Sequence, residues 1–141
     1  MSDGDLNRML ALNPSDNQGV RYALTTCLLE ERTPQARTIL QKLLGDYPDD
    51  GAANWAYNRA LLNFQQEGEG SLAAQRALKA AFKVNPHIPK FILGNRRMPA
   101  ELPRYIDFGD ENEAIEYVAF AIAAWTQTPG AIAWLRAHSR A

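Results

Sequence analysis

The strongest constraint on the fold is a series of proline stops that recurs at a nearly constant spacing. Asn13-Pro14 and Tyr47-Pro48 lie 34 residues apart, and Tyr47-Pro48 and Asn85-Pro86 lie 38 residues apart. Each stop follows apolar residues at helical spacing, and proline ends helices because it lacks a backbone N–H. Ala36 and Ala74 each lie twelve residues before a stop. The pattern predicts pairs of helices with a small residue where the two helices cross.

A helix–turn–helix unit of about 34 residues, with alanine near the start of its second helix, resembles the tetratricopeptide repeat. The resemblance covers residues 13–125 and implies an all-α, right-handed α-α superhelix of about seven helices with a C-terminal capping helix. The sequence departs from the family pattern in places. The aromatic residue near the fourth position of the first helix is Trp55 in one unit but Val20 in the other. Several short segments are also similar to bacterial tetratricopeptide-like proteins.

The sequence predicts a single tetratricopeptide-like domain. Its expected parts are the end of an incomplete repeat (5–14), repeat 1 (15–48), repeat 2 (50–86), a degenerate repeat 3 with a proline-rich loop (87–128) and a capping helix (129–141). An isolated helix of the length predicted at residues 5–12 is marginal in water. This favours a piece of a longer solenoid over a natural N-terminal cap.

Capping residues mark the expected helix starts. Thr33-Pro34 and Ser71 each place a hydroxyl in front of a helical pattern, and Asp110-x-x-Glu113 has the spacing of a capping box. The helix after Asp110 carries Ala114 in the small-residue position and is apolar on most sides. We expect it to be the most buried helix.

Composition places the chain among cytoplasmic proteins with no expected cofactor. The net charge is −1, and a single cysteine, Cys27, permits no internal disulfide. The N-terminus lacks a signal-peptide pattern, and the longest apolar run, residues 114–125, is too short to span a bilayer.

Catalytic and metal-binding chemistry has little support. His87 and His138 lie 51 residues apart and match no zinc motif. Cys27 lies among leucines, which favours a buried apolar role over a reactive thiol. The acidic residues from Asp110 to Glu116 suit the N-terminus of a helix for dipole reasons alone. We therefore predict no catalytic residue, no metal site and no enzymatic activity.

The resemblance instead implies peptide binding, because the first helices of stacked repeats line a concave face. Arginine can bond partner carboxylates, asparagine can bond a peptide backbone, and aromatic rings can pack on apolar side chains. The predicted binding residues on this face are Arg21, Tyr22, Thr25, Trp55, Asn58, Arg59, Asn63 and Lys90. The competing interpretation makes the rings inter-repeat core and the arginines ordinary surface charge. Thr25 replaces an asparagine that a carboxylate clamp of this family requires, so that clamp is not expected.

The expected partner is a protein or peptide, with no membrane contact. A second candidate surface is the basic cluster of the proline-rich loop: Lys90, Arg96, Arg97 and Arg104. Nucleic acid is disfavoured because no aromatic platform is interleaved with these cations; pairing with Asp107, Asp110 and Glu111 is the simpler interpretation. A structural or oligomerisation module, including a homodimer, and an accessory domain of an enzyme remain alternatives.

Overall fold

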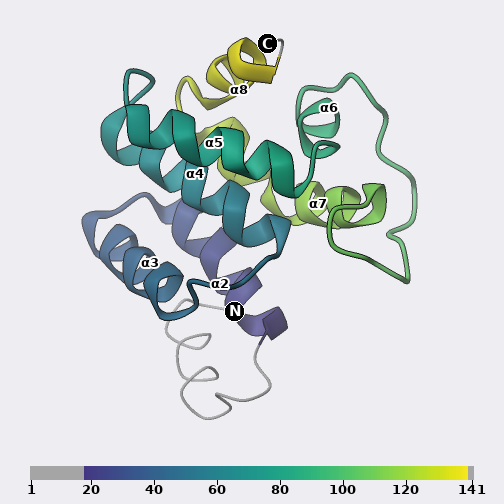
Figure 1. Ribbon diagram of the computed structural model, residues 1–141, viewed down its shortest axis with the longest axis horizontal. Helices are drawn as coiled ribbons and strands as arrows, with labels where there is room; N and C mark the ends of the chain where they lie inside the picture. The colour runs from purple at the N-terminus through teal and green to yellow at the C-terminus, as the bar shows by residue number, and fades with distance from the viewer. Residues whose placement is uncertain (1–17, 140–141) are drawn as a thin grey trace.

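The computed structural model describes residues 18–139, which form seven helices and no strand (Figure 1). The helices are α2 (Gln18–Glu31), α3 (Pro34–Asp46), α4 (Ala53–Glu67), α5 (Leu72–Val84), α6 (Ile88–Ile92), α7 (Glu111–Gln127) and α8 (Ala131–Ser139). The predicted all-α class is confirmed. The helix predicted at residues 5–12 lies outside the described residues.

The predicted helix starts are confirmed by their capping hydrogen bonds. Thr33 Oγ1 accepts from the backbone N–H of Ala36, the third residue of α3, at 3.0 Å, and Ser71 Oγ accepts from the backbone N–H of Ala74, the third residue of α5, at 3.0 Å. Asp110 Oδ1 accepts from Glu113 N at 2.7 Å at the start of α7. Each cap satisfies a backbone donor that has no partner within its helix.

The alanines of the predicted helix crossings are buried, as expected. Ala36 is 1% exposed, and Ala74 and Ala114 are fully buried. The pairs α2–α3 and α4–α5 each pack as a helical hairpin, and Figure 1 shows α4 and α5 side by side. A small side chain at a crossing lets two helices approach closely.

Replacing Ala74 with leucine is expected to lower the free energy of unfolding by about 1–3 kcal/mol, because three extra carbon atoms would overpack a closed crossing. Urea denaturation measures the change. Ala80→Leu is the matched control, since Ala80 lies on the exposed side of the same helix. An equal effect of the two substitutions would contradict the packing argument.

Helix α7 runs alongside both α2 and α4 and in the same direction as α4. At its start, Glu113 Oε2 accepts from the backbone N of Ala53, the first residue of α4, at 2.9 Å. At its end, the carbonyl of Gln127 accepts from Arg32 Nη1, just after α2, at 2.8 Å. The surface on which the sequence predicts an open concave groove is therefore covered by α7.

The expectation that α7 is the most buried helix is wrong, because eight of its 17 residues are buried, against eight of the 15 residues of α4. Ala114, Tyr117, Ala121 and Trp125 face the core, whereas Phe120 is 62% exposed. The contacts of α7 with α2, α4, α6 and α8 leave one flank of the helix open to solvent. Phe120 lies on that flank.

A long loop joins α6 to α7 and forms one edge of the molecule (Figure 1). Met98 packs against the core, whereas Leu102 and Tyr105 are 47% and 84% exposed and do not anchor the loop. The loop is held instead near its end, where Gly109 N donates to Glu113 Oε1 at 2.8 Å. Gly109 has a φ of 87° and passes close to the carbonyl of Val84, so this position requires glycine.

Candidate functional site

Three of the predicted binding residues, Thr25, Trp55 and Asn58, are buried, and two of them, Thr25 and Asn58, form part of a polar network between helices. Asn58 Nδ2 donates to Thr25 Oγ1 at 2.9 Å, and Asn58 Oδ1 accepts from the hydroxyl of Tyr117 at 2.7 Å. That hydroxyl in turn accepts from Trp125 Nε1 at 2.9 Å. Trp55 is 1% exposed, and Thr25 and Asn58 are fully buried. Their predicted place on an open groove is wrong, because α7 packs on this face of α2 and α4.

The predicted cation Arg21 is held by a partner from the turn before α4. Its Nη2 atom lies 2.8 Å from Asp50 Oδ2, and the Asp50 carboxylate also accepts from the hydroxyl of Tyr22 at 2.9 Å. The guanidinium lies 4.1 Å from the ring centroid of Tyr47, and Tyr22 and Trp55 pack against each other at 5.8 Å between centroids. These contacts match the competing interpretation, in which the rings join neighbouring helical hairpins.

Arg59 and Asn63 lie on a different side of α4 from Asn58. Successive residues of a helix are rotated by about 100°, so Arg59 and Asn63 lie roughly 100° and 140° around the helix axis from Asn58. Both side chains are partly exposed. Gln66, on the same side of α4, accepts from Gln41 of α3 at 3.2 Å. The structure therefore does not bring Arg59 and Asn63 together with Thr25 and Asn58.

Lys90 is paired with the first residue of α7. Its Nζ atom lies 3.2 Å from Glu111 Oε2, and Arg96 Nη2 lies 3.2 Å from Glu111 Oε1. The hydrogen bond from Lys90, together with the charge of Arg96, lowers the pKa of Glu111. The basic cluster of the loop is thus partly neutralised within the fold, as the simpler interpretation predicted for Glu111.

The structure instead presents an apolar groove along the N-terminal half of α7, which we name the phenylalanine groove. It encloses a cavity of about 200 Å³. Its walls come from α2 (Tyr22, Ala23 and Thr26), from the start of α4 (Ala52 and Asn54), from the loop before α7 (Ile106 and Phe108) and from α7 itself (Glu113, Glu116, Tyr117 and Phe120). Of the predicted binding residues, Tyr22 lines this groove.

Two exposed phenylalanines line the phenylalanine groove. Phe108 is 63% exposed and Phe120 is 62% exposed. Leu102 and Tyr105 of the preceding loop are also exposed, so most of the large exposed apolar side chains of residues 18–139 lie between 102 and 120. Such concentration of apolar surface marks interaction sites on folded proteins.

Carboxylates lie in the wall of the phenylalanine groove and in the segments next to it. Glu116 lines it, Asp107 precedes Phe108, and Asp49 lies with Phe108 in the wall of an adjoining cavity. None of these three has an ion-pair partner among residues 18–139. Partial burial, with a smaller effect of the Glu113 carboxylate, raises the pKa of Glu116. The groove thus combines apolar walls with uncompensated negative charge.

The sequence model of the family described as ST7 protein matches residues 52–139, more than half of the chain. The chain belongs to the ST7 family. Its assignment to the tetratricopeptide repeat family is therefore wrong. The features that suggested it, small residues at crossings and capped helices ended by proline, are requirements of packed helical hairpins in general.

Protein ST7 homolog of Drosophila melanogaster is 31% identical over 64 residues, which cover 45% of this chain and 12% of that protein. The chain thus spans a small part of this ST7 relative. No solved structure matches the chain. The ST7 segment, residues 52–139, contains both phenylalanines of the groove, whereas the wall from α2 precedes it.

Within residues 18–139 of this ST7-family chain, no group of three or more histidine, cysteine, aspartate or glutamate side chains is arranged to hold a metal ion. No single helix of this part is long and apolar enough to cross a membrane. Helices α7 and α8 satisfy that test only as a pair, with a bend of 117° between them.

Sequence reasoning missed Phe108 and Phe120 as surface residues. The apolar pattern of the helix after Asp110 predicts a buried Phe120, whereas the structure leaves it 62% exposed, and no pattern considered in the sequence singles out Phe108. The available signal was the density of large apolar residues between 102 and 108, since a loop that contributes little to a core has no structural need for them.

Proposed function

We propose that this chain is a non-catalytic protein-binding module that receives a basic amphipathic helix of a partner protein in the phenylalanine groove. The observation that carries the proposal is the pair of phenylalanines, Phe108 and Phe120, each more than three-fifths exposed, on an apolar cavity that has the unpaired carboxylate of Glu116 in its wall. Exposed aromatic side chains at a concave site are typical anchors of protein interfaces.

An amphipathic helix suits the shape of the phenylalanine groove. The groove has one wall on α7 and another on α2, and a partner helix with apolar residues at every third or fourth position could lay them between these walls. The apolar side chains of such a helix would cover Phe108 and Phe120. Burial of this surface is the main driving force for association.

The negative charge near the groove favours a partner helix whose polar face is basic. Asp49, Asp107 and Glu116 can each meet a lysine or arginine, while an acidic helix would be repelled. The Arg21 guanidinium in the adjoining cavity does not compensate them, because Asp50 neutralises it. Binding is expected to weaken as pH falls through the raised pKa of Glu116, because the carboxylate then loses its charge.

The hairpins α2–α3 and α4–α5 support a further proposal about the architecture. They would form successive turns of a right-handed α-α superhelix, with α7 as the first helix of a third turn and α8 as a cap. In this arrangement the groove lies on the side where first helices meet. An experimental structure of a longer ST7-family chain would test it.

The binding proposal is tested with a synthetic peptide that carries leucine at every third or fourth position and lysine on its other face. Phe120→Ser is expected to weaken binding of this peptide by about tenfold or more, since an aromatic anchor contributes more than about 1.4 kcal/mol. Leu72→Ser is the matched control, because Leu72 is 66% exposed and lies on α5, away from the groove. Isothermal titration calorimetry measures the affinities.

Two outcomes would contradict this proposal. The first is equal binding of a peptide in which glutamate replaces every lysine. The second is a stable dimer, detected by light scattering, that Phe120→Ser dissociates while Leu72→Ser does not. The groove would then join two copies of the chain, and the oligomerisation module would replace the peptide-binding module.

A further inference from the structure

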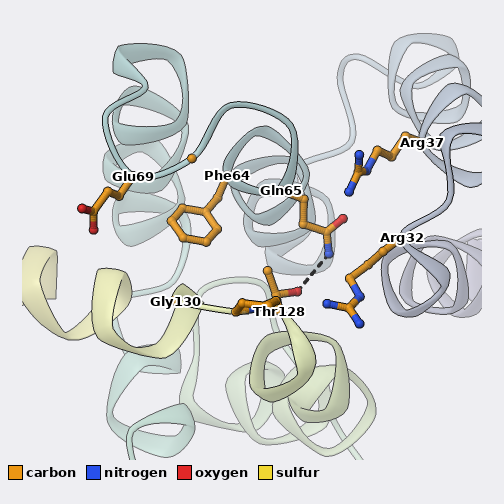
Figure 2. Close-up of a pocket in the computed structure, with 9 residues that line it drawn as sticks. Arg32, Arg37, Phe64, Gln65, Glu69, Thr128 and Gly130 are labelled. Atoms are coloured by element: carbon orange, nitrogen blue, oxygen red, sulfur yellow. Dashed lines mark hydrogen bonds between the residues drawn. The ribbon is translucent and has the colours of Figure 1, made fainter.

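A second cavity, of about 400 Å³, lies at the other end of α7 (Figure 2). It is open to solvent and is formed by the turn between α2 and α3, the N-terminal part of α3, the C-terminal end of α4 with the turn that follows it, and the turn between α7 and α8. We name it the arginine cavity, after Arg32 and Arg37 in its wall. The phenylalanine groove lies along the N-terminal half of α7, so the two sites are separate.

Two guanidinium groups point into the arginine cavity. Figure 2 shows the side chains of Arg32 and Arg37 directed toward Gln65 and Thr128. Arg32 adopts a positive φ of 56° between α2 and α3 and is anchored by its hydrogen bond to the carbonyl of Gln127, at 2.8 Å. This bond uses one of five guanidinium donors, so others stay available.

The side chain of Arg37 has a hydrogen-bond donor without an acceptor. Its Nε atom is buried and has no hydrogen-bond partner among residues 18–139. Neither Arg32 nor Arg37 has a carboxylate within ion-pair distance in that part of the chain. In Figure 2, Glu69 lies at the far end of the cavity from both guanidinium groups. A buried donor without a partner is destabilising, and a ligand that accepts from it would remove that cost.

Gln65 supplies the complementary group. Its Nε2 atom donates to the carbonyl of Leu29 and to Thr128 Oγ1, both at 3.0 Å, and these bonds fix the orientation of the amide. The Thr128 hydroxyl must act as acceptor here, because it donates to the carbonyl of Ala124 at 2.7 Å. Gln65 Oε1 is therefore the free end of the amide, buried and without a partner in the described part of the chain.

We propose that the arginine cavity binds a small oxyanion, a carboxylate or a phosphate, that also carries a hydrogen-bond donor. The guanidinium groups of Arg32 and Arg37 would hold the oxyanion, since their planar donors match the geometry of both anion types. An O–H or N–H of the ligand would donate to Gln65 Oε1. The start of α8 beside Gly130 contributes positive potential, whereas the C-terminal ends of α2, α4 and α7 contribute negative potential at the same cavity. The attraction for an oxyanion therefore comes from the two guanidinium groups.

The test is a titration followed by the arginine Nε–H and glutamine side-chain N–H signals of the ¹⁵N-labelled chain. The probes are acetate, glycolate, inorganic phosphate and chloride at matched ionic strength. Glycolate or phosphate is expected to shift the Arg37 Nε–H and Gln65 signals with saturation. Glycolate should bind more tightly than acetate, from which it differs by one hydroxyl. The comparison of glycolate with phosphate identifies which oxyanion the cavity prefers.

Arg37→Gln is expected to weaken binding by about tenfold or more, since a charge-assisted hydrogen bond contributes more than about 1.4 kcal/mol. Arg97→Gln is the matched control, an exposed arginine of the loop outside the cavity. The proposal is overturned if no oxyanion gives a saturable shift, if chloride does so equally, or if Arg37→Gln leaves the titration unchanged. Equal affinity for acetate and glycolate would overturn the role of Gln65. Circular dichroism of both variants confirms that the fold is retained.

Discussion

Replacing Asn58 with alanine is expected to lower the free energy of unfolding by about 3–5 kcal/mol. The amide of Asn58 accepts from the Tyr117 hydroxyl and donates to Thr25 Oγ1, and it is fully buried between α2, α4 and α7. Alanine would remove one hydrogen bond each from Tyr117 and Thr25, whose side chains are buried from water. It would also open a cavity. The expected loss is a large part of the stability of an ordinary domain.

Urea denaturation at constant temperature measures this loss. Asn63→Ala is the matched control: the same residue type on the same helix, partly exposed and without a hydrogen bond in the described part of the chain. Its effect is expected to stay within about 0.5 kcal/mol. An equal loss of unfolding free energy in Asn58→Ala and Asn63→Ala would contradict the prediction. It would mean that the buried network does not hold α7 against the two hairpins.

Raising the pH above about 10 is expected to destabilise the fold by about 3 kcal/mol per pH unit through two tyrosines, Tyr57 and Tyr117. Burial is the largest cause that raises the pKa of each hydroxyl well above its ordinary value. In the unfolded chain both hydroxyls ionise near pH 10, while in the folded chain they stay neutral. Their contribution is therefore fully present below pH 10 and is lost as the pH rises toward their folded pKa values.

Urea denaturation at a series of alkaline pH values checks this expectation. Tyr57→Phe should reduce the slope of stability against pH by about 1.4 kcal/mol per unit, because one ionising group is gone. Its hydroxyl donates to the carbonyl of Asn85 at 2.5 Å, so the variant is also expected to be less stable at neutral pH. Tyr105→Phe is the control, because it removes the same hydroxyl from a tyrosine that is 84% exposed. An unchanged slope in Tyr57→Phe would contradict the claim that ionisation of Tyr57 destabilises the fold at alkaline pH.

Short-range signals in the sequence predicted the local structure well. Thr33, Ser71 and Asp110 cap the helices that follow them, and Ala36 and Ala74 are buried. A cap acts on a backbone N–H three residues away, so its physics is contained in a few adjacent residues. The all-α class follows from the same local patterns.

The candidate site could not be predicted in this way, because it depends on where α7 packs. Arg21 and Asp50 are 29 residues apart, and Arg32 contacts a carbonyl 95 residues along the chain. Periodicity showed that residues of α2 and α4 share a face but not which helix covers that face. With α7 on it, Thr25 and Asn58 become core, and Phe120 is left on the exposed flank.

The sequence by itself determined the helical class, the starts of the helices and the small residues at their crossings. These features depend on backbone hydrogen bonding and side-chain size over a few helical turns. Only the tertiary structure decided which polar residues are buried and where apolar and charged surface remains. The physical reason is that burial belongs to the assembled packing of α2, α4 and α7, and a residue's own helix does not determine it. The phenylalanine groove and the arginine cavity exist because α7 runs between them, with Glu113 bonded at one end and Gln127 at the other.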